Sequence, residues 1–122
     1  MPTYRNDRVS EQVHKEVARI LRDEVKNPHL PTDRVSVISA QVTRDMSHAT
    51  VRVSVYGDEA MKKDAMQALR SASGFIRRSL GRVLTTRITP ELHFELDDSI
   101  EYSIHIQEVL ESIEKERNAH EG

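Results

Sequence analysis

Three arginines lie close together in a stretch of the chain that contains no acidic residue. Arg77, Arg78 and Arg82 fall between Asp64 and Glu91, and no aspartate or glutamate occurs between those two positions. Arginine also outnumbers lysine thirteen to five, and its planar guanidinium binds phosphate oxygens in a bidentate way that lysine cannot match. The pattern favours a site for a polyanion such as RNA, and the alternative is a solvated charged face without a ligand.

The charge of the whole chain is uninformative, whereas its distribution is not. The net charge is −2, but residues 71–90 carry four arginines and no acid, and residues 91–122 carry two basic and ten acidic residues. A basic centre followed by an acidic end predicts that a polyanion site occupies only part of the surface.

Other polar and basic residues extend the candidate site. Arg78 and Arg82 are spaced four residues apart, so on a helix their repulsion would be relieved by a bound phosphate. Ser73 and Gly74 come just before them, and exposed N–H groups there would add a helix-terminus anion site. Lys62 and Lys63 have acidic neighbours, so ordinary surface pairing is an equal alternative for them. Arg5 and Arg8 are further candidates, with Asp7 and Glu11 as alternative local partners. Arg44 and Arg87 are the last two, with a solvated role as the equal alternative.

Several classes of chemistry are excluded by the residues themselves. The chain has no cysteine, which rules out disulfides, thiolate zinc sites, iron–sulfur clusters and thiol catalysis. His93 and Glu95 form an H-x-E pair, but the zinc deaminases that use this pair also need two cysteines. There is no P-loop, H-E-x-x-H or G-x-S-x-G motif. We therefore expect a protein without catalysis, cofactor or metal.

The location of the protein is also constrained. No apolar run approaches the roughly 20 residues of a membrane-spanning helix, and the charged start MPTYRNDRVS lacks the apolar segment of a secretory signal. We expect a cytoplasmic protein with no membrane partner, and nothing in the sequence requires more than a monomer.

The first half of the chain is expected to form a helix and a hairpin. Helical spacing over 5–26 predicts a buried stripe, and the proline at position 28 ends the helix. Alternating β-branched residues predict strands at 35–43 and 49–56, joined by a polar turn at 44–48. Asp58 is a good N-cap for the helix that follows. The stripe of the first helix consists of Val9, Val13, Val17, Ile20, Leu21 and Val25.

The second half is expected to contain a broken helix, a strand and a final helix. A helical pattern runs from Glu59, breaks at 71–74 and resumes at Phe75, where glycine and serine disfavour a straight helix. Residues 91–97 alternate as a strand with Leu92 and Phe94 inward, and Asp98 or Ser99 caps a last helix. The second part of the broken helix has the inward residues Ile76, Leu80, Val83 and Leu84. The last helix has the buried stripe Tyr102, Ile106, Val109, Leu110 and Ile113.

This order of elements predicts one α+β domain spanning 1–122, with an ordered core over about 5–114 and a short charged tail. Three strands cannot close a barrel, so helices must cover one face of the sheet. Only five aromatic residues are present, and no two adjacent strands carry a pair of them. Recognition of RNA backbone and shape is therefore favoured over base stacking.

Several motifs in the right order resemble one family. The opening R-x-x-R-V-S-E-Q-V at 5–13, the pattern D-x-S-x-A-x-V-x-V-S-V-x-G at 45–57 and the stretch from Gly74 to Phe94 with T-P-E-L at 89–92 are similar to ribosome-binding factor A. This family consists of bacterial assembly factors of the 30S ribosomal subunit. The matching motifs cover residues 5 to about 113.

The resemblance implies a type II KH-like domain of order α-β-β-α-α-β with a C-terminal helix. In place of the usual GXXG loop the chain has Ala72-Ser73-Gly74, where the family has a helix–kink–helix. The resemblance further implies a protein that is not an enzyme, binds free 30S subunits and 16S rRNA, assists late 30S maturation and 16S rRNA processing, and takes part in cold adaptation. The acidic end would face away from RNA or contact a small-subunit ribosomal protein. A helix-turn-helix DNA-binding protein is the alternative that the helix pair leaves open.

Overall fold

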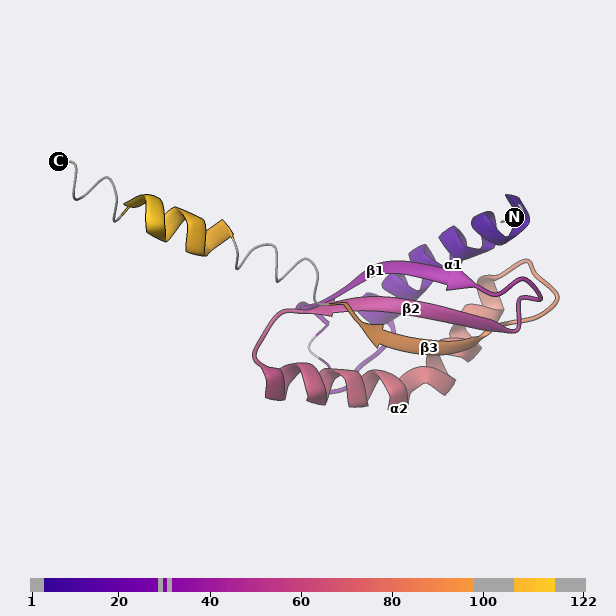
Figure 1. Cartoon of the computed structure of the whole chain (residues 1–122). Helices are drawn as coiled ribbons and strands as arrows, with labels where there is room; N and C mark the ends of the chain where they lie inside the picture. Colours follow the sequence, from indigo (N-terminus) through magenta and orange to yellow (C-terminus); the bar gives the residue numbers. More distant parts are fainter. Residues whose placement is uncertain (1–3, 29, 31, 98–106, 116–122) are drawn as a thin grey trace.

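The computed structural model describes residues 4–28, 30, 32–97 and 107–115, and for Tyr4 and Arg5 it describes the backbone alone (Figure 1). The elements are α1 (Tyr4–Asp23), β1 (Val35–Val42), β2 (His48–Val55), α2 (Glu59–Val83) and β3 (Glu91–Leu96). A further helix covers residues 107–115. Within these ranges, no helix has the length and apolar character needed to cross a membrane.

The three strands form one mixed sheet in the order β1-β2-β3. β1 and β2 pair antiparallel, whereas β2 and β3 pair in parallel. A register shift between Val37 and Ser39 places Ile38 as an extra residue in β1, and this bulge keeps valines on the same face before and after it. One face of the sheet is therefore apolar and the other carries polar side chains, as the alternation predicts.

Both helices cover the apolar face. α1 packs mainly against β1, α2 packs against β3, and the two helices contact each other. The predicted stripe of α1 is buried throughout, and it meets Ala49, Val51, Val53 and Val55 of β2, each with at most 2% of its surface exposed. Burial of this many aliphatic side chains is the main stabilising contribution to such a layered fold.

α1 ends three residues earlier than the sequence pattern predicts. The helix stops at Asp23, and the N–H groups of Glu24 and Val25 both donate to the carbonyl of Ile20, at 2.9 and 3.0 Å. Hydrogen bonds of this kind close a helix C-terminus. Val25 remains buried although it lies outside the helix, because the turn folds it back onto the core.

The predicted change of direction in the second helical region is present, but it occurs inside one continuous helix. Asp58 caps α2 by accepting a hydrogen bond from the N–H of Met61 at 2.8 Å, and the helix then continues to Val83. Figure 1 shows its ribbon turning partway along. Ser73 Oγ donates to the carbonyl of Arg70 at 2.8 Å, a back-bond of the type that bends helices.

The glycine at the expected kink keeps a helical backbone. Gly74 has no positive φ, and a Cβ there would find only Arg78 Nη1, at 3.7 Å. Val83 also departs from its predicted inward position, with 38% of its surface exposed, because α2 ends there and the core is closed by Leu84 instead.

The prediction of a buried stripe on the last helix is wrong for the part that the structure describes. Val109, Leu110 and Ile113 are 43, 60 and 55% exposed, while Tyr102 and Ile106 lie outside the described residues. The physical reason is that α1 and α2 already cover the apolar face of the sheet, so the core has no surface left for another helix.

Candidate nucleic-acid interface

Segments from across the sequence meet at one end of the molecule. Asn6 of α1 donates to the carbonyl of Thr43 at 2.8 Å, and the N–H of Glu91 donates to the carbonyl of Ser47 at 2.9 Å. Gln12 of α1 donates to the carbonyl of Val83 at 3.4 Å. These bonds join the start of α1, the β1–β2 turn, the end of α2 and the start of β3 (Figure 1).

This end carries most of the predicted phosphate-binding residues, and we call it the basic end. Arg8 lies in the first turns of α1, Arg44 in the β1–β2 turn, and Arg87 in the loop between α2 and β3, and all three are exposed. Arg78 and Arg82 lie on the last turns of α2 and are also exposed. Arg5 is in α1, and its side chain is not among those described. The structure thus gathers residues that are far apart in the sequence.

Arg78 and Arg82 have no carboxylate partner among the described residues, in contrast to Arg19 and Arg22 of α1. Arg19 pairs with Glu16 and Glu24, at 2.9 and 3.0 Å. Arg22 pairs with Asp23 at 3.1 Å. The second half of α2 and the loop after it therefore supply no local acid to pair with these arginines, because none occurs in the sequence from 65 to 90.

Arg77 has a structural contact. Its Nε and Nη2 both donate to the carbonyl of Thr89, at 3.3 and 3.0 Å. Helix and loop are also close at Gly81, where an added Cβ would lie 2.9 Å from Thr89 Oγ1. Arg77 thus holds the 85–90 loop, and with it Arg87, against the helix that carries Arg78 and Arg82.

The turn that presents Arg44 is ordered by its neighbour. The Asp45 carboxylate accepts hydrogen bonds from Ser47 Oγ at 2.7 Å, Ser47 N at 3.1 Å and Thr43 Oγ1 at 2.8 Å. These donors, the Ser47 hydroxyl foremost, lower the pKa of Asp45 to about 2. Met46 takes a left-handed conformation with φ of 64°, which completes the tight turn.

The two lysines lie at the opposite end of the molecule, in the first turns of α2. Lys62 is buried, with 8% of its surface exposed, and its Nζ lies 3.8 Å from Glu59 Oε1. Lys63 is exposed, but the length of α2 separates it from the basic end. Neither lysine belongs to the same surface as the arginines.

The expected helix-terminus anion site is absent, because the described α2 has no start at 73–75. The N–H groups of Ser73 and Gly74 lie inside the continuous helix, so they are not free donors. Arg82 instead stands in the last turn, where its charge is favourable to the helix dipole. Any anion binding at this surface must therefore come from the arginine side chains.

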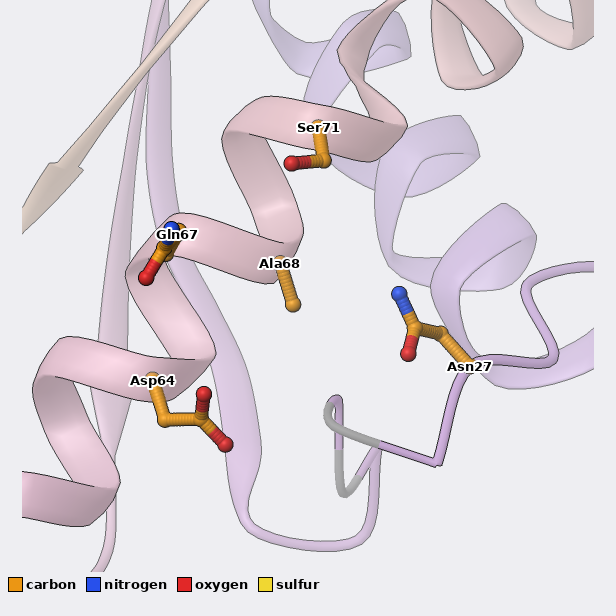
Figure 2. Close-up of a pocket in the computed structure, with 5 residues that line it drawn as sticks. All are labelled: Asn27, Asp64, Gln67, Ala68 and Ser71. Carbon is orange, nitrogen blue, oxygen red and sulfur yellow. The ribbon is translucent and has the colours of Figure 1, made fainter.

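A surface hollow of about 270 Å³ lies between the chain after α1 and the first half of α2. Figure 2 shows the Asn27 and Asp64 side chains directed toward it, with Ala68 and Ser71 along its helix wall. A carboxylate at its edge makes this hollow a poor phosphate site, so it is separate in character from the basic end.

One group of residues was missed by reasoning from the sequence. His48, Glu91 and His93 come together where β2 and β3 begin. The sequence shows Glu91 and His93 two positions apart at the start of a strand. It does not show that this strand pairs in parallel with β2, which is what brings His48 beside them.

The fold and its basic end define a KH-like α+β protein. The family model described as ribosome-binding factor A matches residues 5–110. The ribosome-binding factor A of Moorella thermoacetica is 49% identical over 108 residues, covering 88% of each chain. The chain therefore belongs to the ribosome-binding factor A family.

A crystal structure and a fitted homology model share the fold. The crystal structure of ribosome-binding factor A from Thermus thermophilus matches with a TM-score of 0.65 at 22% identity, over 75% of this chain and 94% of that one. A homology model of the Thermus thermophilus factor, fitted into a cryo-EM map of its 30S complex, matches with a TM-score of 0.60 at 22% identity. That match covers 73% of this chain and 91% of the other.

Proposed function

We propose that this protein binds free 30S ribosomal subunits in the cytoplasm and assists late 30S maturation and 16S rRNA processing, without catalysing a reaction itself. Membership of the ribosome-binding factor A family supports binding to the ribosome. The 30S subunit is supported by the Thermus thermophilus relative, which was fitted into a map of a 30S complex. The protein acts as a monomeric single RNA-binding domain, with the acidic C-terminal residues turned away from the RNA or against a ribosomal protein.

The observation that carries this proposal is the gathering of exposed arginines at the basic end. Arg78 and Arg82 have no described carboxylate within ion-pairing distance, and Arg8, Arg44 and Arg87 are exposed on segments that hydrogen bonds join at the same end. Phosphate oxygens would satisfy these guanidinium groups and release counterions. Arg77 contributes by holding the loop that bears Arg87.

The recognition is of backbone and shape. Tyr56, which is 74% exposed, follows the C-terminal end of β2 and lies far from the basic end. Phe75 lies one turn before Arg78 on α2 and is 41% exposed, but no two described aromatic side chains form a stacking platform beside the arginines. Reading a folded rRNA surface through its phosphates suits a factor that recognises a stage of assembly.

The test is a comparison of two double variants with the same loss of charge. Arg78→Gln/Arg82→Gln removes two charges from the basic end, and Arg22→Gln/Arg34→Gln removes two from the opposite end. In co-sedimentation with free 30S subunits we expect the first variant to bind at least about tenfold more weakly, or roughly 1.4 kcal/mol. Each arginine–phosphate pair that the first variant removes should flatten the slope of log affinity against log salt by about 0.7–0.9. The control should keep wild-type affinity and slope.

Other outcomes would contradict the proposal in distinct ways. Equal binding by both variants would make the basic end a solvated surface. Preferential sedimentation with joined ribosomes would contradict specificity for free 30S subunits. Tighter binding to bare DNA would favour the helix-turn-helix alternative, although a continuous α2 lacks the turn which that motif requires. In cells lacking the protein, rescue of precursor 16S rRNA accumulation by the control but not by the first variant would link the same surface to maturation.

A further inference from the structure

Two histidines and a glutamate meet on the open face of the sheet. The parallel register places His48 opposite Glu91, and Thr50 opposite His93. His48 Nδ1 and His93 Nε2 share a hydrogen bond of 2.9 Å, and Glu91 Oε2 lies 3.7 Å from the same His48 nitrogen. One ligand atom from each of the three residues lies within 4.8 Å of the others.

This arrangement is close to that of a metal site. In a tetrahedral zinc site with Zn–N distances of about 2.0–2.1 Å, neighbouring ligand atoms are about 3.3 Å apart. His48 Nδ1 lies 2.9 Å from His93 Nε2 and 3.7 Å from Glu91 Oε2, on either side of that value, and all three ligand atoms lie within 4.8 Å of one another. His48 and Glu91 have 49 and 58% of their side chains exposed, so small rotations can bring the three atoms onto one ion.

The donor set also decides which ion would bind. Imidazole nitrogen is preferred by zinc, cobalt, nickel and copper, whereas magnesium prefers oxygen and water. Two imidazoles and one carboxylate, open to solvent, leave a coordination position for water, as three-ligand zinc sites do.

We propose that His48, Glu91 and His93 form a binding site for a divalent transition-metal ion of the zinc type, with water completing the coordination. The ion bridges the first residue of β2 and the start of β3. These strands are distant in the sequence, and an ion held by both binds the folded chain in preference to the unfolded one. The site therefore couples metal binding to the stability of the parallel strand pair.

The experiment is calorimetric titration of the untagged, full-length protein with zinc, in a buffer containing excess magnesium. We expect one ion per chain, a melting temperature that rises with zinc, and no displacement by magnesium. His48→Asn, His93→Asn and Glu91→Gln should each weaken binding about tenfold or more. Glu95→Gln is the matched control, because Glu95 lies on the same exposed face of β3, pairs with Arg52 at 3.9 Å, and loses the same charge.

A second measurement uses the wild-type protein alone and does not depend on the variants folding. Zinc added to isotopically labelled protein should shift or broaden the backbone amide signals around 47–50 and 90–94 before any others. Zinc binding of wild-type strength by the His48→Asn/His93→Asn variant would overturn the proposal. So would equal losses in Glu91→Gln and Glu95→Gln, or spectral changes centred on another part of the chain.

Discussion

At the scale of single residues, Asp45 orders the turn that presents Arg44 at the basic end. Its carboxylate holds the turn beside Arg44, and its pKa is lowered from 3.8 to about 2. A carboxyl with a lower pKa in the folded chain stabilises the fold above its unfolded pKa, and this contribution is lost as the pH falls through the folded value. Stability should therefore decrease between about pH 4 and pH 2.

The measurement is the free energy of unfolding across this pH window for the wild type and for Asp45→Asn. The variant should lose less stability on acidification, because its amide does not titrate. Ser47→Ala serves as the companion variant, since removal of the hydroxyl donor should raise the pKa of Asp45 toward its ordinary value. A carboxyl titration followed by NMR that shows no such rise in Ser47→Ala would contradict the assigned cause.

The backbone geometry of two glycines predicts opposite effects of substitution by alanine on stability. Gly57 has φ of 151°, and a Cβ there would lie 3.0 Å from Met61 Sδ, so Gly57→Ala should cost about 1–3 kcal/mol. Gly74 is helical, and an added Cβ would make only an ordinary contact with Arg78 Nη1 at 3.7 Å, so Gly74→Ala should stabilise by up to about 1 kcal/mol. Urea denaturation of the two variants tests both signs, and destabilisation by Gly74→Ala would indicate that the bend of α2 requires glycine at this position.

At the scale of elements, α2 and the helix at 107–115 contribute unequally to the stability of the fold. Leu80 in α2 has no exposed surface, whereas Leu110 in the 107–115 helix is 60% exposed. Leu80→Ala should therefore destabilise by about 2–5 kcal/mol, and Leu110→Ala by less than about 0.5 kcal/mol. The same substitution at both sites is compared by chemical denaturation. A loss at Leu110 comparable to that at Leu80 would show that this helix packs on the core after all.

At the scale of the whole molecule, the fold separates charge into regions. Arg19 and Arg22 of α1 and Arg52 on the open sheet face are paired with acids, while Arg78 and Arg82 on the second half of α2 are not. The hydrogen bond from Arg77 and the small size of Gly81 allow the 85–90 loop to pack closely against α2. The loop that bears Arg87 is thereby held against the helix that bears Arg78 and Arg82. This arrangement is why the charge-matched double variants are expected to differ, although each removes two arginines.

The sequence by itself determined the local structure and the family. The stripe of α1, the alternation of the strands and the Asp58 cap depend on neighbours a few positions apart, so periodicity and capping chemistry were enough to predict them. The exposure of Arg78 and Arg82 followed from the same helical spacing. The family followed from several motifs in order along the chain.

Tertiary structure alone decided which distant residues meet. The parallel pairing of β2 with β3 brings His48 to Glu91 and His93, and contacts across the fold bring Arg8, Arg44 and Arg87 to the end of α2. It also decided that Lys62 is buried and that α2 continues through 71–74. The apolar pattern of 107–115 resembles that of a core helix, but burial depends on whether a free apolar surface remains, and α1 and α2 have already covered it.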